Sequence, residues 1–246
     1  ETKDGVFHSR YPAGLPLLFA AAWKVGGLNA AVWINPLLAS ATVLLVFFLA
    51  RRFGPEAYAL LAAAVVAAVP VTNQHALDAD AHVAAAFFLV AGVCALLRFG
   101  ELAGGMGILP RSASGSVEPM ARRDGRGQIR GQAARTTVAV GLIAGVLLGA
   151  VPTVRYPEAI VGVAIGAWLL WRVRPIWRMW PAVFGALLPI GALGVHNTAA
   201  YGAFWRTGYS LTNEQTGFGF SYFASHVIPY LQAHGGHGIA LMFAFG

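Results

Sequence analysis

The chain has 246 residues, of which 57% are hydrophobic and only 11% are charged. Soluble domains carry about 25% charged residues, so this composition excludes a soluble globular protein and predicts an integral membrane protein. The net charge of +7 therefore concerns orientation in a bilayer more than nucleic acid, for which no recognition motif is present. The single cysteine, Cys94, excludes an internal disulfide.

The apolar segments predict an all-α bundle of membrane-spanning helices. The first segment, 12–24, is short, holds two prolines and ends at Lys24, so we expect an amphipathic helix at the membrane interface. A helix over 81–97 would reach about 25 Å, enough for a thin or tilted crossing. The predicted spans are 30–50, 56–69, 81–97, 137–151, 159–171, 181–195 and the start of another at 238–246.

Two segments interrupt these spans. Pro70 and Asn73 predict a break, with a loop or a helix N-terminus over 71–80. Residues 103–135 are rich in Gly, Ser and Arg, which predicts a disordered basic loop inside the domain. Because the chain starts at Glu1 and stops inside an apolar run, we expect residues 1–246 to be part of a longer transmembrane domain.

The basic residues give the spans an orientation. When the spans alternate across a bilayer, one side holds twelve of the 17 Lys and Arg residues, including the 103–135 loop, and the other side holds five. Positive residues concentrate on the cytoplasmic side, so the first side should be cytoplasmic. The outer side then receives all seven His residues and the acids Asp4, Asp78, Asp80, Glu158 and Glu214.

The segment HALDADAHVAAAFF (75–88) places acids and histidines directly before a span. If the helix starts early, His75, Asp78 and His82 share one face and could bind a divalent metal. If it starts near Ala81, Asp80 lies at the cap instead, and either aspartate could simply cap the helix. His82 could also be an ordinary interfacial hydrogen-bonding residue.

The segment PTVRYPE (152–158) lies between two short helices at or near membrane depth. Charged residues there are costly and usually face a cavity or a partner. Arg155 and Glu158 therefore have two open interpretations. They form a local ion pair that caps a hairpin, or Arg155 offers its planar guanidinium to an anion such as phosphate.

Two further segments carry polar groups to the same side. FHSRYPAG (7–14) contributes Arg10 and Tyr11, which serve either as interface anchors or as ligand-binding groups. HNTAAYGAFWRTGYS (196–210) begins with His196 and Asn197. Its aromatic residues could form an interfacial belt or stack on sugar rings; they are Tyr201, Trp205 and Tyr209.

The order of these segments resembles the polytopic GT-C glycosyltransferases, in the branch related to protein O-mannosyltransferases and lipid A aminoarabinose transferases. Members often show YP-G-PLL, S(H/D)xP---FF and N---FG-PF-TGY patterns. The matching stretches here are YPAG (11–14), AHVAAAFF (81–88) and NTAAYGAFWRTGY (197–209), with Ala84 in place of the proline. The similarity extends over nearly the whole chain except 103–135.

This resemblance implies a GT-C bundle that moves a sugar from a polyprenyl-phosphate donor to a lipid, glycan or protein acceptor. The reaction would occur on the extracytoplasmic face of a plasma membrane, here expected to be a bacterial inner membrane, within cell-envelope synthesis. The family's main catalytic acid lies in the first outer loop, most of which we expect upstream of Glu1, where only Asp4 is near.

The reaction needs a base for the acceptor hydroxyl and cations for the departing phosphate. We therefore assign a catalytic role to Asp80 or Asp78, and phosphate binding to Arg155 and Arg10. No metal ligand or cofactor is assigned, although a divalent metal stays an alternative. The remaining substrate-binding candidates are Tyr11, His82, Glu158, His196 and Asn197.

Two other classes of protein stay open. A transporter or channel subunit also contains broken helices and intramembrane charges, but usually near the bilayer midplane. A scaffolding membrane protein with a decayed site would retain the helices without the catalytic acid. The chain contains no Walker loop, dinucleotide fingerprint or Ser-His-Asp elbow, so soluble nucleotide cofactors are not indicated.

Overall fold

A computed structural model describes residues 2–3, 6–7, 9, 11–103, 126–172, 176–210 and 220–234. Within these residues the chain is helical apart from turns and one short antiparallel pair, β1 (Thr2–Lys3) and β2 (Val6–Phe7). The all-α prediction is therefore confirmed for the described chain. The final predicted span, 238–246, lies outside it.

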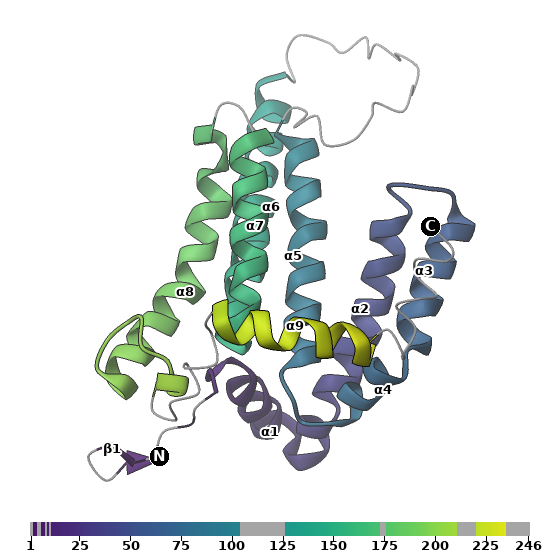
Figure 1. The fold of residues 1–246 in the computed structure, drawn as a ribbon. Helices are drawn as coiled ribbons and strands as arrows, with labels where there is room; N and C mark the ends of the chain where they lie inside the picture. The colour runs from purple at the N-terminus through teal and green to yellow at the C-terminus, as the bar shows by residue number, and fades with distance from the viewer. Residues whose placement is uncertain are drawn as a thin grey trace.

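Four helices stand side by side and form the main bundle (Figure 1). They are α5 (His82–Leu102), α6 (Arg126–Val154), α7 (Ala159–Arg172) and α8 (Trp180–Tyr201). The most extensive contacts join α6 to α8 and α5 to α6, so α6 is the central helix. One core cluster lies between them, with Leu96 and Phe99 of α5 packed near Ala144 and Ala182.

A row of glycines lets α6 and α8 approach closely. Gly141, Gly145 and Gly149 recur every four residues and share one face of α6. A Cβ atom at Gly145 would lie 2.0 Å from the carbonyl oxygen of Ala182, and one at Gly185 of α8 would lie 2.2 Å from that of Leu142. Small residues at this spacing are typical of membrane helices whose backbones touch.

A second group of helices packs beside α5: α2 (Ile34–Ala50), α3 (Glu56–Ala68) and α4 (Pro70–Leu77). Pro70 occupies the start of α4, where its missing N–H costs nothing, and α3 and α4 meet at a bend of 57°. The predicted break at Pro70 is confirmed. The segment after it is mostly helical, however, because α4 continues to Leu77.

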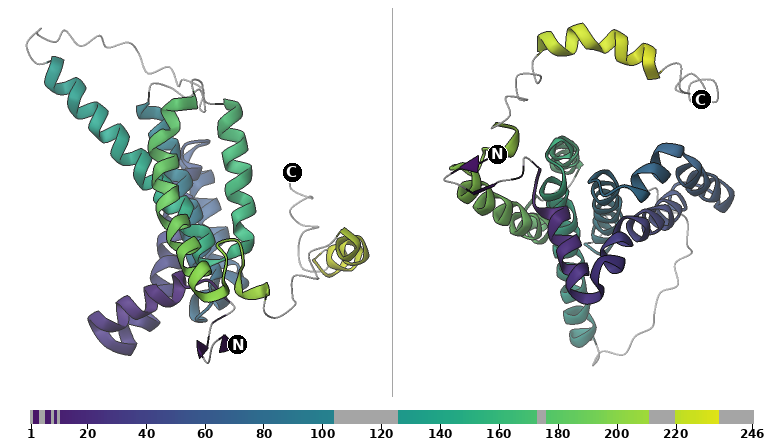
Figure 2. Two further views of the ribbon diagram at one scale, coloured as in Figure 1. Left: turned by 90° about the vertical axis from the view of Figure 1, so that its left-hand side faces the viewer. Right: turned by 90° about the horizontal axis from the view of Figure 1, so that it is seen from below.

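Helix α1 (Gly14–Val32) lies across one end of the bundle (Figures 1 and 2). The predicted boundary between the interfacial helix and the first span is wrong, because residues 30–32 belong to α1 and α2 begins at Ile34. Gly26 and Gly27 bend α1, and Gly27 has a φ of 66°, which favours glycine. The crosswise position is compatible with an interfacial helix.

Helix α6 also starts earlier than expected. Its first residue, Arg126, lies inside the segment predicted to be a disordered loop, so the last part of 103–135 is helical and that prediction is wrong there. Residues 104–125 lie outside the described chain. Helix α9 (Phe220–His234) was not predicted and lies apart from the bundle (Figure 2).

By length and composition, four described helices could cross a membrane, or five if α3 and α4 form one bent span. The four are Gly14–Val32, His82–Leu102, Ala134–Val154 and Ile176–Tyr201. Helices α2 and α7 are apolar but shorter. The structure is thus compatible with an integral membrane protein.

Charges gather at the end of the bundle far from α1. Glu101 at the end of α5 accepts hydrogen bonds from Arg52 (3.0 Å) and Arg98 (2.9 Å). Arg178 of the 3-10 helix η3 (Ile176–Met179) donates to the Ala103 carbonyl at 3.5 Å. The predicted separation of this basic group from the outer-face residues is therefore present in the fold.

Candidate functional site

Four polar segments meet at the α1 end of the bundle (Figure 1). They are the α4–α5 turn, the 3-10 helix η2 (Tyr156–Glu158) after α6, the C-terminal end of α8 and the residues before α1. All four were predicted to lie on one side of the membrane, and all four do lie at one end of the fold.

The α4–α5 turn brings Asp80 together with two histidines. One Asp80 carboxylate oxygen is hydrogen-bonded to Nδ1 of His75, and the other accepts the backbone N–H of His82 at 3.0 Å. The imidazole rings of His75 and His82 stack, with centroids 4.3 Å apart and planes 21° apart. A carboxylate that is hydrogen-bonded to an imidazole fixes the orientation of the ring.

Asp78 does not join this cluster, so of the two alternatives the early helix start, with His75, Asp78 and His82 on one face, is excluded. The physical reason is that α4 ends at Leu77 and Asp78 is extended (φ −86°, ψ 150°), which breaks the helical spacing. The Asp78 carboxylate is exposed and has no hydrogen-bond or ionic partner among the described residues. The alternative of a helix start near Ala81 is confirmed, since α5 begins at His82.

Asn35 of α2 anchors the α4–α5 turn through hydrogen bonds to its backbone. Its side chain is 2% exposed, and its amide nitrogen donates to the carbonyl oxygens of Asp78 (2.6 Å) and Asp80 (3.0 Å). Our sequence prediction missed this residue. A polar side chain in an otherwise apolar predicted span is the feature that could have revealed it, because buried amides usually bond to a specific partner.

Arg155 and Glu158 form an ion pair at the α6–η2 turn. Val154 ends α6, Arg155 is extended, and Tyr156-Pro157 opens η2, so Arg155 and Glu158 face each other across one turn. Oε1 of Glu158 pairs with Arg155, whereas the buried Oε2 has no hydrogen-bond partner within the described part of the chain. The ion-pair interpretation is confirmed, and anion binding by Arg155 stays a prediction.

The two clusters are close enough to influence each other. The charges of Arg155 and Glu158 act on the imidazole of His82, together with those of Asp80 and His75. Five ionisable side chains from two turns therefore share one electrostatic environment. His82 is exposed, which leaves this environment open to solvent or to a ligand.

Asn197 and Tyr156 join α8 to η2. The Tyr156 hydroxyl donates to Oδ1 of Asn197 at 3.0 Å, and Nδ2 of Asn197 donates to the Phe204 carbonyl at 3.2 Å. Asn197 is 3% exposed, and burial raises the pKa of the Tyr156 phenol well above its usual range, so it stays protonated. These contacts position the Arg155 turn. Asn197 was predicted to bind substrate, but in the structure both polar groups of its side chain are hydrogen-bonded within the protein, to Tyr156 and to the Phe204 carbonyl.

Of the aromatic residues in 196–210, Tyr201 and Tyr209 pack within the candidate site, whereas Trp205 is exposed as a residue of an interfacial belt would be. Tyr209, in the 3-10 helix η4 (Gly208–Ser210), packs edge-on against Tyr11 (6.2 Å) and Tyr156 (5.9 Å). The buried Tyr201 donates to the Ser9 carbonyl at 2.6 Å. Trp205 is 68% exposed, as an interfacial residue would be. The sequence pattern alone could not separate these two groups.

The two remaining predicted residues are less well connected. His196 packs its ring edge-on against Tyr201 at 6.1 Å, and no described contact links it to Asp80 or Arg155. Arg10 lies outside the described residues. Gly14, four residues later in the sequence, starts α1 in contact with α6, where an added Cβ would lie 2.4 Å from the Thr153 carbonyl oxygen. The glycine of the YPAG motif thus allows α1 to contact the end of α6.

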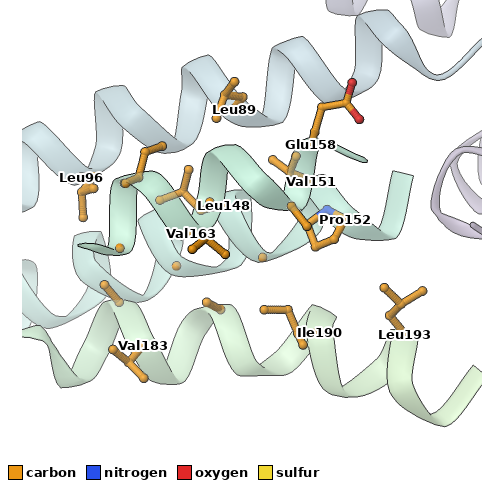
Figure 3. A pocket seen from close by; sticks show the side chains of 18 of the residues that line it. Leu89, Leu96, Leu148, Val151, Pro152, Glu158, Val163, Val183, Ile190 and Leu193 are labelled. Carbon is orange, nitrogen blue, oxygen red and sulfur yellow. The ribbon is translucent and has the colours of Figure 1, made fainter. Parts of the chain in front are cut away.

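An apolar cavity of about 470 Å³ lies between α5, α6, α7 and α8 (Figure 3). Among the described residues that line it, Glu158 is the only charged one, and it lies at one end, beside Val151 and Pro152. Leu96 lies near the opposite end. The other lining residues are aliphatic or small, so the cavity suits a hydrocarbon chain rather than a polar ligand.

Comparison with known proteins gave no match to a family model, to a curated protein or to a solved structure.

Proposed function

We propose that the chain is part of a membrane glycosyltransferase of GT-C type, which moves a sugar from a polyprenyl-phosphate donor to an acceptor on the extracytoplasmic side. The observation that carries this proposal is the apolar cavity that ends at Glu158, next to Arg155. A lipid with an anionic head has the same division into a long apolar part and a charged end.

The cavity accounts for the lipid part of such a donor. Its volume of about 470 Å³ lies within the range of small-ligand sites, and burying each CH₂ group of a chain contributes about 0.8 kcal/mol. Gly162 and Gly166 of α7 line it, with no other atom within 4 Å of where a side chain would begin. These glycines keep the α7 wall open.

Arg155 supports the phosphate part. A guanidinium offers several N–H donors in a plane, which suits a phosphate, and a fixed cation stabilises the charge that develops when phosphate leaves. One guanidinium nitrogen of Arg155 pairs with Oε1 of Glu158, and Glu158 itself lines the cavity. The sugar would then lie toward Asp80, His75 and His82.

The Asp80 cluster supplies a base for the transfer. The acceptor O–H oxygen attacks the anomeric carbon, and a bond forms between them. The bond from that carbon to the phosphate oxygen breaks, and its electron pair leaves with the polyprenyl phosphate. The proton of the acceptor passes to His75, which Asp80 orients through their hydrogen bond.

The distribution of charge favours an enzyme over a transporter. A transporter places ionisable groups near the midplane of its bundle. In the described part of α5, α7 and α8, charged residues occupy the helix ends, and the interior between them is apolar. The candidate site lies at one end of the bundle, next to a cavity that could hold part of a lipid chain. This arrangement fits a reaction at the membrane surface.

The test uses the full-length protein in membranes with a labelled polyprenyl-phosphate sugar. Arg155→Ala should lower transfer by roughly 10²–10³-fold, the usual loss for one transition-state donor. The matched control is Arg206→Ala, because Arg206 is exposed at the same end of the bundle and makes no described side-chain contact. Equal activity in both variants would refute the role of Arg155.

A second variant in the same assay tests the lipid. Gly162→Leu should fill the cavity without displacing a helix, and transfer should fall while the protein stays folded. Gly191→Leu is the matched control, because Gly191 is equally unhindered but does not line the cavity. If Gly162→Leu retains full activity, the donor chain does not bind there.

A further inference from the structure

We propose that His75, Asp80 and His82 form a binding site for one divalent transition-metal ion. Each side chain offers one ligand atom, and these atoms all lie within 4.8 Å of one another. Among the described residues, no other group of histidines, cysteines and acids comes together in this way. A bound ion would occupy the lone pair of the His75 imidazole, so this site is an alternative to the base role proposed above for that residue. Its test does not use activity.

The local backbone orients the three ligands before an ion binds. His75 is on the last turn of α4, His82 is the first residue of α5, and Asp80 lies in the turn between them. The backbone N–H of His82 fixes one Asp80 oxygen at 3.0 Å, which aims the other oxygen at His75. Asn35 anchors the turn from α2, as supporting residues do around metal ligands.

The spacing requires only side-chain movement. Ligand atoms bound to Zn²⁺ at about 2.0–2.1 Å lie roughly 3.3 Å apart in tetrahedral geometry. The ligand atoms of His75, Asp80 and His82 already lie within 4.8 Å of one another, so the shifts required are on the scale of side-chain rotations. The exposed His82 ring leaves a path for the ion to enter.

The ligand types select the ion. Two imidazoles and one carboxylate suit Zn²⁺, Co²⁺ or Fe²⁺, whereas Mg²⁺ and Ca²⁺ prefer oxygen ligands alone. Three protein ligands leave at least one coordination position for water or an anionic oxygen. Because Arg155 and Glu158 neutralise each other nearby, the carboxylate of Asp80 can attract the cation without a net opposing charge.

The experiment measures metal binding by the full chain, purified in detergent without a histidine tag and stripped with EDTA. Zn²⁺ is titrated by calorimetry, and Co²⁺ is followed by its visible absorption. The wild-type chain should bind about one ion. His75→Ala, Asp80→Asn and His82→Ala should each weaken binding by at least 10–100-fold, and Mg²⁺ should not compete.

Two controls match the chemistry of the ligands. Asp78→Asn removes an exposed carboxylate two residues from Asp80, and His196→Ala removes another imidazole at the same end of the bundle. Both should bind Zn²⁺ as the wild-type chain does. A Zn²⁺-dependent rise in melting temperature, lost in Asp80→Asn, gives a second readout, and size-exclusion profiles identify variants that misfold.

Either of two results would overturn the site. In the first, the wild-type chain would bind Zn²⁺ no more tightly than Asp80→Asn does, so that His75 and Asp80 would form a hydrogen-bonded pair and no metal site. Alternatively, Asp78→Asn loses as much affinity as Asp80→Asn, which assigns binding to general negative charge.

Discussion

Asn35 determines how the two neighbouring aspartates differ. It lies 43 residues before Asp78 in sequence, yet its amide binds the backbone carbonyls of both aspartates. With both carbonyls directed at α2, the turn leaves the Asp78 carboxylate in solvent and directs that of Asp80 toward His75. The choice between the two acids is thus made by a residue on another helix.

Replacement of Asn35 by alanine should therefore destabilise the site. The two carbonyl oxygens would lose their donor in a part-buried location, at a cost of about 1–3 kcal/mol each. We expect the apparent melting temperature in detergent to fall by several degrees, and protease cleavage near residues 78–81 to become faster. Ser40→Ala on the same helix is the control, because Ser40 is exposed and bonds only to the Pro36 carbonyl of its own helix.

An unchanged melting temperature in Asn35→Ala would show that the turn keeps its shape without this anchor. Asn35→Asp separates shape from hydrogen bonding, since it keeps the size of the side chain but replaces the donor by a second oxygen. It should be at least as destabilised as Asn35→Ala, because an acidic oxygen would then face two carbonyl oxygens.

At the scale of the elements, the contact between α6 and α8 organises the bundle. Gly145 and Gly149 place α6 directly against the backbone of Ala182 and Ala186, and the same helices form one wall of the apolar cavity. Because the two backbones touch, the distance between α6 and α8 is set by glycines rather than by large side chains. The width of the cavity depends on that spacing.

Gly145→Ala should separate α6 from α8. Its Cβ would lie 2.0 Å from the Ala182 carbonyl oxygen, a distance that backbone movement must relieve, and overpacking of this kind costs about 1–3 kcal/mol. We expect a lower melting temperature in detergent, and a greater loss for Gly145→Leu. Gly191→Ala in α8 should have the opposite sign, because its Cβ meets no atom within 4 Å and alanine favours a helix by about 1 kcal/mol.

A melting temperature for Gly145→Ala that equals or exceeds that of Gly191→Ala would mean that α6 and α8 do not touch at this point. The comparison is internal, since both changes add one methyl group to a helix.

At the scale of the whole molecule, the polar groups divide between two ends. The Asp80 and Arg155 clusters lie at the α1 end, while Arg52, Arg98 and Arg178 lie at the other (Figure 1). In a membrane, the first end should face the extracytoplasmic side and the basic end the cytoplasm.

Cysteine labelling in sealed membranes measures this orientation. In a Cys94→Ala background, single cysteines at Leu77 (82% exposed) and at Phe53 (66% exposed) report the two ends of the bundle. An impermeant maleimide added outside should label Leu77→Cys at once, and Phe53→Cys only after the membrane is opened. Trp23→Cys in α1 should behave like Leu77→Cys if α1 lies at the interface.

Labelling of Leu77→Cys and Phe53→Cys from the same side would contradict a crossing by the α3–α4 pair, which is the segment between them. Labelling of both in the reversed order would leave the crossings intact but place the candidate site in the cytoplasm, and the proposed reaction with it.

Composition and local pattern were enough to predict the class of the fold. Apolar runs of helical length leave few alternatives to helices, proline and glycine mark where they break, and the bias of Lys and Arg sorts their ends. The residues of the α4–α5 turn, Arg155 and Glu158 were identified as candidates because charge beside an apolar run is costly unless it has a partner.

The tertiary structure decided what local pattern cannot encode. It selected Asp80 over Asp78 through Asn35, turned Tyr209 inward onto Tyr11 and Tyr156, and closed α6 on α8 around a cavity that ends at Glu158. Each of these depends on contacts between residues far apart in the chain. Periodicity reports which face of a helix is apolar, but only packing determines which residues of other helices that face will meet.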